Sequence, residues 1–441
     1  MSAGLSRPAV AATAREGARW VRRALWLSVL LLLAIACWAQ WRTQLRPAGS
    51  ALHTPVAFNS TPQLVAQGAL LARAGNCAAC HTTRGGAPLA GGRAILTPFG
   101  AVYGGNLTPD RATGLGAWSA DDFWRALHHG ESRDGRWLSP AFPYPHFTRV
   151  SRSDSDALYA YLRSVPPVAQ AHKPSELRFP FNTQLALGVW RLFFFSAGEF
   201  QPDAAQSVEW NRGAYLVSGL GHCSACHAPR NALGAGSQDL LALGGGELPL
   251  QHWLAPSLRS PHEGGVADWP LSDVVALLRD GVSPQATVMG PMAEVVAGST
   301  QHLPEADLRA IATFLKALPQ DDTAPPAAAE PANVLTLKLG REVYGQHCAD
   351  CHGEQGQGAQ GAYPALAGNR AVTQASPLNA LRMVLVGGYA PSTAGNPRPW
   401  GMPPLGPTLS DAEVAAVVSY IRQSWGHSAS AATVLQAQQA R

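Results

Sequence analysis

One five-residue pattern, Cys-x-x-Cys-His, occurs three times in this sequence and takes up six of its seven cysteines. The copies are CAACH at 77–81, CSACH at 223–227 and CADCH at 348–352. Two thiols at this spacing can form thioether bonds to the vinyl groups of a haem, and the adjacent histidine can then reach the iron. The pattern therefore predicts three covalently bound haem c groups and cores built partly around porphyrin.

The expected haem contacts follow from these motifs. The attachment residues are Cys77, Cys80, Cys223, Cys226, Cys348 and Cys351, and the proximal iron ligands are His81, His227 and His352. A structural zinc site would need its cysteine and histidine pairs within about 20 residues of each other, and these pairs lie much farther apart. A thioredoxin-like dithiol would need a strand-rich context, which the flanking sequence lacks.

Length and composition agree with one domain for each motif. A chain of 441 residues predicts about three domains at roughly 150 residues each. The chain is 46% hydrophobic and 14% charged, with a net charge of +4. So small a charge favours neither nucleic-acid binding nor an acidic interaction tail.

The N-terminal part predicts a membrane segment. An apolar run over 24–41, interrupted only by Ser28 and Gln40, follows four arginines at 15, 19, 22 and 23. A helix of this length nearly spans a hydrocarbon core of about 30 Å, and the arginines would stay on the cytoplasmic side. We therefore expect an anchor in the bacterial inner membrane, with the haem domains in the periplasm.

Two other fates of this segment stay open. It can be a signal peptide cut after a small residue such as Ala36 or Ala39. It can also be a lipoprotein signal that uses Cys37, although Ala34 and the bulky Trp38 fit that pattern poorly.

Three aligned stretches, 154–162, 307–315 and 413–421, indicate an internal repeat of mainly α-helical units. Each places an acid in its first turn and an aromatic residue near its end, and each motif is preceded by a helix glycine: Gly68, Gly213 or Gly340. Because glycine costs a helix about 1 kcal/mol relative to alanine, we expect a second helix to cross closely at each one, over the aromatic residue.

The predicted boundaries follow from this repeat. They are a basic segment and anchor at 1–50, a first domain at 51–170, a connector at 171–206, a second domain at 207–322, a Pro/Ala linker at 323–333, a third domain at 334–427 and a disordered tail at 428–441. The connector contains an apolar block at 185–195. This block predicts a helix that packs between domains, or one that lies on a membrane or partner surface.

An opening helix with a glycine, a haem motif, a loop and a closing helix with an aromatic residue together resemble the class I cytochrome c fold. Three such units behind a membrane segment resemble the three-haem cytochrome c subunits of bacterial membrane-bound dehydrogenases. Those serve quinoprotein alcohol, flavin-dependent sugar-acid (gluconate-type), and molybdenum-containing aldehyde or nicotinate-type dehydrogenases. The matching stretches are NLTPD at 106–110, RGAYL at 212–216 and GPMAEVV at 290–296.

The resemblance implies a second set of iron contacts. A proline carbonyl after each motif usually accepts the other ring N–H of the proximal histidine, which points to Pro88, Pro229 and Pro364. A methionine before each closing helix usually supplies the sixth ligand, which points to Met292 and Met402. Met289 lies three residues from Met292, and Met383 fits a helix core better.

The first unit departs from this pattern, since no methionine occurs between residues 2 and 288. Phe142 stands where most relatives have methionine, and His146 is the nearest replacement ligand. His146 can equally be a loop histidine, with His128 and His129 as weaker candidates, or the iron can lack a sixth ligand. Because thioether ligation raises a haem potential, we expect the first haem to have the lowest potential.

These features predict an electron-transfer subunit. Electrons would come from a periplasmic dehydrogenase and leave to ubiquinone, or to a soluble cytochrome or oxidase. The sequence has no dinucleotide-binding fingerprint and no phosphate loop, so the chemistry would belong to the haems and the partner. The alternative is a haem enzyme, such as a peroxidase, that uses an open first haem.

Overall fold

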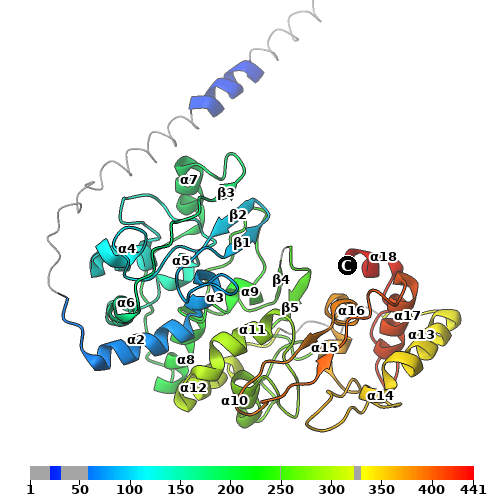
Figure 1. The fold of residues 1–441 in the computed structure, drawn as a ribbon. Coiled ribbons are helices and arrows are strands. Elements are labelled where there is room, and N and C mark those ends of the chain that lie inside the picture. The colour runs from blue at the N-terminus through cyan, green and yellow to red at the C-terminus, as the bar shows by residue number, and fades with distance from the viewer. Residues whose placement is uncertain (1–19, 31–57, 249, 322–328) are drawn as a thin grey trace, which may run out of the picture.

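The computed structural model describes residues 20–30, 58–248, 250–321 and 329–441. Within these residues the protein is mainly helical, with three small antiparallel sheets (Figure 1). Three helix pairs organise it, and each pair flanks one CxxCH motif. We name the segments that contain these pairs unit 1 (58–170), unit 2 (207–321) and unit 3 (329–441).

Unit 1 is built on the crossing of α2 and α6. Its elements are α2 (Pro62–Ala74), α3 (Cys77–His81), β1 (Ala94–Thr97), β2 (Gly100–Tyr103), the 3₁₀ helix η1 (Leu115–Ala117), α4 (Ala120–His129), α5 (Tyr144–Phe147) and α6 (Arg152–Ser164). The α4 start is fixed by a capping box, in which Ser119 and Asp122 satisfy each other's backbone N–H groups.

Unit 2 repeats this order after a connector. The connector holds β3 (Glu176–Leu177), which extends the β1–β2 sheet, and α7 (Gln184–Phe194). The unit itself comprises α8 (Val208–Ser218), α9 (Ser224–His227), β4 (Gly246–Leu248), β5 (Trp253–Ala255), α10 (Leu271–Asp280), α11 (Pro291–Gly298), η2 (Thr300–His302) and α12 (Glu305–Lys316). Its helix pair is α8 and α12.

Unit 3 closes on the pair α13 and α17. Its elements are α13 (Val334–His347), α14 (Ala349–His352), α15 (Arg370–Thr373), α16 (Leu378–Val386), β6 (Gly388–Tyr389), β7 (Gly401–Met402), α17 (Asp411–Arg422) and α18 (Val434–Gln439). A second capping box, Ser410 with Glu413, begins α17.

Each helix pair crosses at the glycine that the sequence singles out. A Cβ added to Gly68, Gly213 or Gly340 would lie 1.9, 2.0 or 2.2 Å from a carbonyl oxygen of the facing helix. It would also lie 2.7–2.8 Å from the Cβ of the facing aromatic residue: Tyr161, Phe314 or Tyr420. The predicted close crossing over the aromatic residue is therefore confirmed in all three units.

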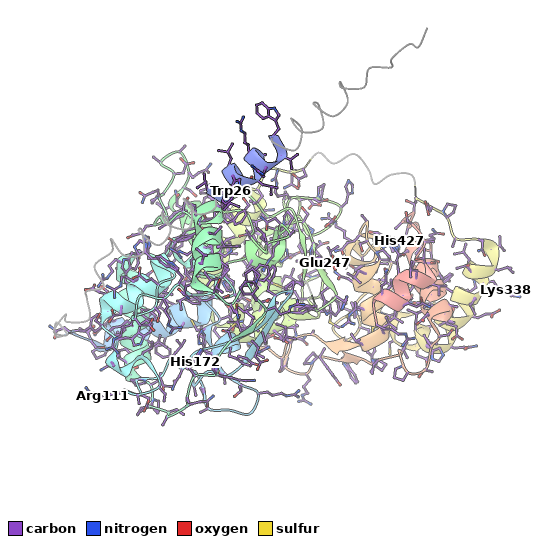
Figure 2. The ribbon with its side chains drawn as sticks, turned by 90° about the horizontal axis from the view of Figure 1, so that it is seen from above. Trp26, Arg111, His172, Glu247, Lys338 and His427 are labelled. Atoms are coloured by element: carbon purple, nitrogen blue, oxygen red, sulfur yellow. The ribbon has the colours of Figure 1, made fainter. Side chains whose placement is uncertain are left out.

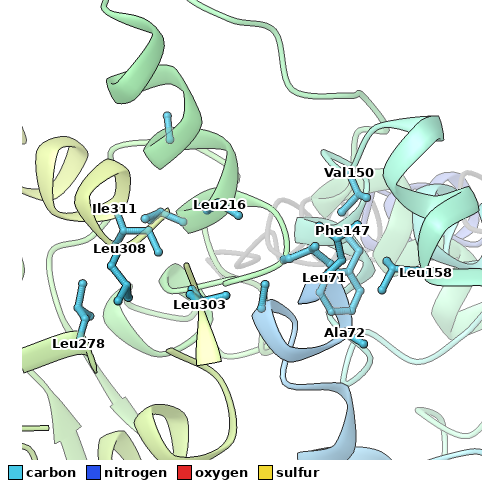
Figure 3. Close-up of a cluster of buried hydrophobic side chains, with 14 of the residues drawn as sticks. Leu71, Ala72, Phe147, Val150, Leu158, Leu216, Leu278, Leu303, Leu308 and Ile311 are labelled. Carbon is cyan, nitrogen blue, oxygen red and sulfur yellow. The ribbon is translucent and has the colours of Figure 1, made fainter. Parts of the chain in front are cut away.

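Units 1 and 2 share one hydrophobic core, whereas unit 3 has its own. Figure 3 shows side chains of the shared core, including Leu71, Phe147 and Leu158 from unit 1 beside Leu216 and Leu308 from unit 2. Units 1 and 3 lie at opposite ends of the molecule, as Arg111 and Lys338 mark in Figure 2.

Unit 3 joins unit 2 through polar contacts. The Asn379 side chain accepts a hydrogen bond from the Leu254 N–H at 2.9 Å and donates one to the Leu254 carbonyl at 2.8 Å. Arg370 forms an ion pair with Asp268. These contacts hold the third unit against the second.

The C-terminal segment differs from the sequence-based expectation. Residues 428–441, expected to be disordered, include α18, which packs on α17 with Ala432, Ala437 and Ala440 buried. The small alanine side chains allow this close approach. Arg422, only 1% exposed, anchors the segment by donating from Nε to the Ser430 carbonyl at 2.8 Å.

The expected membrane segment falls partly outside the described residues. Residues 20–30 form a helix with exposed apolar side chains, and 31–41 are not among the residues described. In the ranges that the structure does describe, no helix is both long and apolar enough to cross a bilayer.

The connector helix α7 has no fully buried side chain, and its Trp190 donates from Nε1 to the Leu233 carbonyl of unit 2 at 3.0 Å.

Candidate haem sites

Each CxxCH motif forms a short helical turn that follows the opening helix of its unit (α2, α8 or α13) within a few residues. The helical turn brings the first cysteine and the histidine four residues later to one face. Backbone carbonyls fix each histidine ring through its Nδ1 atom. Nδ1 of His81, His227 and His352 lies 2.7, 2.8 and 3.0 Å from the carbonyl oxygens of Gly105, Pro256 and Pro364.

These contacts set the chemistry of the imidazoles. A carbonyl oxygen can only accept, so Nδ1 carries the proton and Nε2 keeps its lone pair for a metal. Desolvation by burial lowers the pKa of all three histidines, which keeps them neutral. The residues therefore present three oriented neutral imidazoles, each beside two thiols.

The carbonyl partners correct two sequence-based expectations. Pro364 is confirmed, but the expected Pro88 and Pro229 are wrong: Gly105 and Pro256 hold these places instead. In units 1 and 2 a β-hairpin lies between the motif and the acceptor, so the chain comes back to the histidine only after this hairpin. Gly104 lets it pass the motif closely, because a Cβ there would lie 2.0 Å from the Cys80 carbonyl oxygen.

A cavity of about 1010 Å³ runs through units 2 and 3. Its wall contains both cysteines and the histidine of the second and third motifs. Most of the remaining wall is apolar, including Trp253, Trp269 and Leu278. Paired thiols, a neutral imidazole and a mostly apolar wall are the groups that a covalently attached porphyrin needs, so the residues fit haem c.

The first motif adjoins this same cavity. Ala74 and Asn76, which lie just before Cys77, belong to the cavity wall. Asn76 has a left-handed backbone with φ 47°, a conformation that asparagine tolerates better than most residues. The attachment point of the first motif is thus close to the space beside the second.

Four methionines line the cavity, but they are not equivalent. Met292 is the second residue of α11, and Met402 ends β7. Met289 and Met383 instead both lie near Gly388 of unit 3, because a Cβ added there would lie 4.0 and 3.9 Å from their Cε atoms. The structure thus separates Met292 from Met289 by environment, and iron ligation by Met292 and Met402 stays a prediction.

His146 lies beside the second motif. Its Nδ1 is 3.5 Å from the Ser224 Oγ, and its ring centroid is 6.5 Å from that of His222. Desolvation, reinforced by His222 and nearby arginines, lowers the pKa of His146 to about 3, so the imidazole is neutral. Its role as sixth ligand of the first iron stays a prediction.

The two weaker histidine candidates lie at the end of α4. The His128 ring stacks on Trp124 with centroids 4.4 Å apart. Both α4 and α10 end just before a glycine with a left-handed backbone. When the two helices are aligned on this glycine, His128 and His129 occupy the positions of Arg279 and Asp280. Neither Arg279 nor Asp280 belongs to the cavity wall, and the two form an ion pair with each other.

Sequence reasoning missed His222, the residue immediately before the second motif. It lines the cavity, has φ 38°, and its Nδ1 lies 2.6 Å from the Leu220 carbonyl oxygen. The available signal was its position directly before the first cysteine of the motif, which Asn76 occupies in unit 1. Nothing in the sequence alone connected it to unit 1.

The crossing helix pairs, the cysteine pairs and the carbonyl-backed imidazoles define a c-type cytochrome. A family model described as cytochrome c matches residues 65–166 and 337–425. The cytochrome c subunit of gluconate 2-dehydrogenase from Pantoea cypripedii is 39% identical over 83% of this chain and 87% of that relative. The chain therefore belongs to the family of dehydrogenase cytochrome c subunits.

Other relatives carry similar names. The cytochrome c subunit of a quinone-type alcohol dehydrogenase from Gluconacetobacter polyoxogenes is 39% identical over 87% of this chain and 84% of its own length. A nicotinate dehydrogenase subunit from Pseudomonas putida is 41% identical over 87% of this chain, which covers 32% of that longer protein.

Proposed function

We propose that this chain carries three haem c groups and relays electrons from a catalytic dehydrogenase subunit to ubiquinone or another respiratory acceptor. The observation that carries the proposal is the continuity of the sites. One cavity includes the second and third motifs, and residues beside the first motif form part of its wall. This continuity supports a relay in which the second site lies between the other two.

Haem supplies one-electron redox chemistry when bound, and the chain's own residues bind and orient it. The cysteine pairs would hold the haem covalently, and the three histidines, with Nδ1 held by carbonyls, would offer Nε2 to its iron. The mostly apolar wall would limit contact between the haem and water, which disfavours side reactions with solvent. Attachment in the periplasm, with the segment at 24–41 as a membrane anchor, is part of this proposal.

The haem count is tested by replacing one cysteine pair at a time with serine. Each double variant, such as Cys348→Ser with Cys351→Ser, is expected to lose one of three covalent haems. Intact mass and the haem absorbance per polypeptide measure this loss directly. A wild-type protein with only two haems, or a pair whose loss removes none, would contradict the proposal.

A second prediction concerns the first unit. Because thioether ligation raises a haem potential, the site with Phe142 is expected to have the lowest of three midpoint potentials. Phe142→Met is expected to raise that lowest potential and leave the other two in place in a redox titration. Three similar high potentials in the wild type would overturn this assignment, and an unchanged spectrum in His146→Ala would exclude His146 as the ligand.

Phe142 also supports the second candidate function, a haem enzyme with an open position at the first site. Rapid binding of carbon monoxide or cyanide at one haem, together with peroxide turnover, would favour an enzyme. Inert six-coordinate spectra would favour the relay.

A further inference from the structure

Units 1 and 2 contact each other in two matching places. In each, a residue near the short helix α11 or α5 of one unit touches a residue that lies just before the haem motif of the other. In one contact, the Ser299 Oγ of unit 2 donates to the Ala74 carbonyl of unit 1 at 3.1 Å. In the other, Phe147 of unit 1 meets His222 of unit 2, edge to face, with ring centroids 5.6 Å apart. Only the second contact joins aromatic rings.

This aromatic contact continues in both directions. Phe147, only 6% exposed, also packs edge to face on Phe142 at 5.3 Å. Phe142 holds the place where the resemblance expects the sixth ligand of the first iron. On the other side, His222 lines the cavity of the second motif. Three rings thus lead from the distal segment of unit 1 to the second haem site.

Two of the three rings, His222 and Phe147, are held firmly by their surroundings. The His222 ring is fixed by its contact with the Leu220 carbonyl oxygen at 2.6 Å. Phe147 lies in the shared core (Figure 3). Edge-to-face pairs at such centroid distances are in van der Waals contact and leave no gap between the rings.

We propose that Phe142, Phe147 and His222 form the contact route for electrons between the first and second haem sites. The proposal rests on the relay function above. One electron leaves the first site, which is oxidised by one equivalent, and enters the second, which is reduced by one equivalent. Tunnelling through packed atoms decays less steeply than tunnelling across a gap, so the contacts between the three rings favour electron transfer along this route.

Two substitutions interrupt the route while preserving the local fold. Phe147→Leu removes a ring but keeps an apolar side chain in the core. His222→Asn removes a ring but keeps a residue type that tolerates the left-handed backbone. Phe200→Leu is the matched control, because Phe200 packs on Tyr215 at 5.7 Å, next to the same unit boundary, and neither residue lines the cavity.

The experiment photoreduces the purified full-length protein and follows electron transfer between its haems, with haem content and midpoint potentials measured in parallel. We expect both route variants to slow transfer between the first two haems several-fold at unchanged haem content and potentials, with no change in Phe200→Leu. Equal rates in all variants, or equal slowing in the control, would overturn the route. A wild-type protein without three haems would overturn the relay function first, and the route with it.

Discussion

Gly340→Ala is expected to destabilise unit 3 strongly, although alanine is the better helix former. The new Cβ would lie 2.2 Å from the Ala416 carbonyl oxygen and 2.7 Å from the Tyr420 Cβ. One of these atoms is backbone and the other begins a packed aromatic side chain, so α13 and α17 must move apart. Overpacking of this kind costs about 1–3 kcal/mol or more, which exceeds a propensity gain of about 1 kcal/mol.

The same helix offers a matched control. Gly345 also lies in α13, and an added Cβ there meets nothing within 4 Å. Gly345→Ala is therefore expected to stabilise unit 3 by about 0.5–1 kcal/mol, through helix propensity alone. Chemical unfolding of the full-length protein, followed by the absorbance of its haems, measures both. Opposite signs are expected for the two variants, and a shared sign would refute the close crossing as the reason for the glycine.

These glycines show which part of the fold could be predicted from sequence. Gly68, Gly213 and Gly340 recur at one place in a repeated pattern, and only a close crossing explains an unfavourable residue there. The proximal histidines were equally accessible, because adjacency in the chain fixes adjacency in a helical turn. Local pattern and repetition are enough when the interaction spans a few residues.

Longer-range partners could not be predicted in this way. Gly105 and Pro256 accept from histidines 24 and 29 residues earlier, whereas Pro364 follows its histidine by only 12. The hairpins that delay the return in units 1 and 2 are short and weakly patterned. The structured C-terminal segment was missed for a related reason, because an alanine-rich composition is equally typical of a frayed tail and of a close-packed helix.

His146 could be predicted in part from local sequence, but its long-range partner could not. The sequence selects it as the nearest possible ligand in unit 1, yet its Nδ1 faces Ser224 of the second motif. Nothing in a linear sequence predicts that the distal segment of one unit packs on the motif of the next. The shared core of units 1 and 2 creates that contact.

The largest spectroscopic effect is expected from Met292→Leu. Leucine keeps most of the volume of methionine but has no sulfur to bind iron. If Met292 is the sixth ligand, the second haem is expected to become five-coordinate and high-spin, to bind carbon monoxide, and to fall in midpoint potential. Absorbance, carbon monoxide difference spectra and redox titration of the purified full-length protein report these changes independently of any partner.

Met289→Leu is the control that makes this result specific. Both methionines line the cavity and lie three residues apart, so both variants remove one thioether from the same wall. Met289, however, lies near Gly388 at the boundary with unit 3, and its loss is expected to leave the spectrum unchanged. The reverse outcome would transfer the ligand role to Met289 and place the second iron closer to unit 3. Equal, silent variants would show that no methionine of this segment binds iron, and the expected order of potentials would then lose its basis.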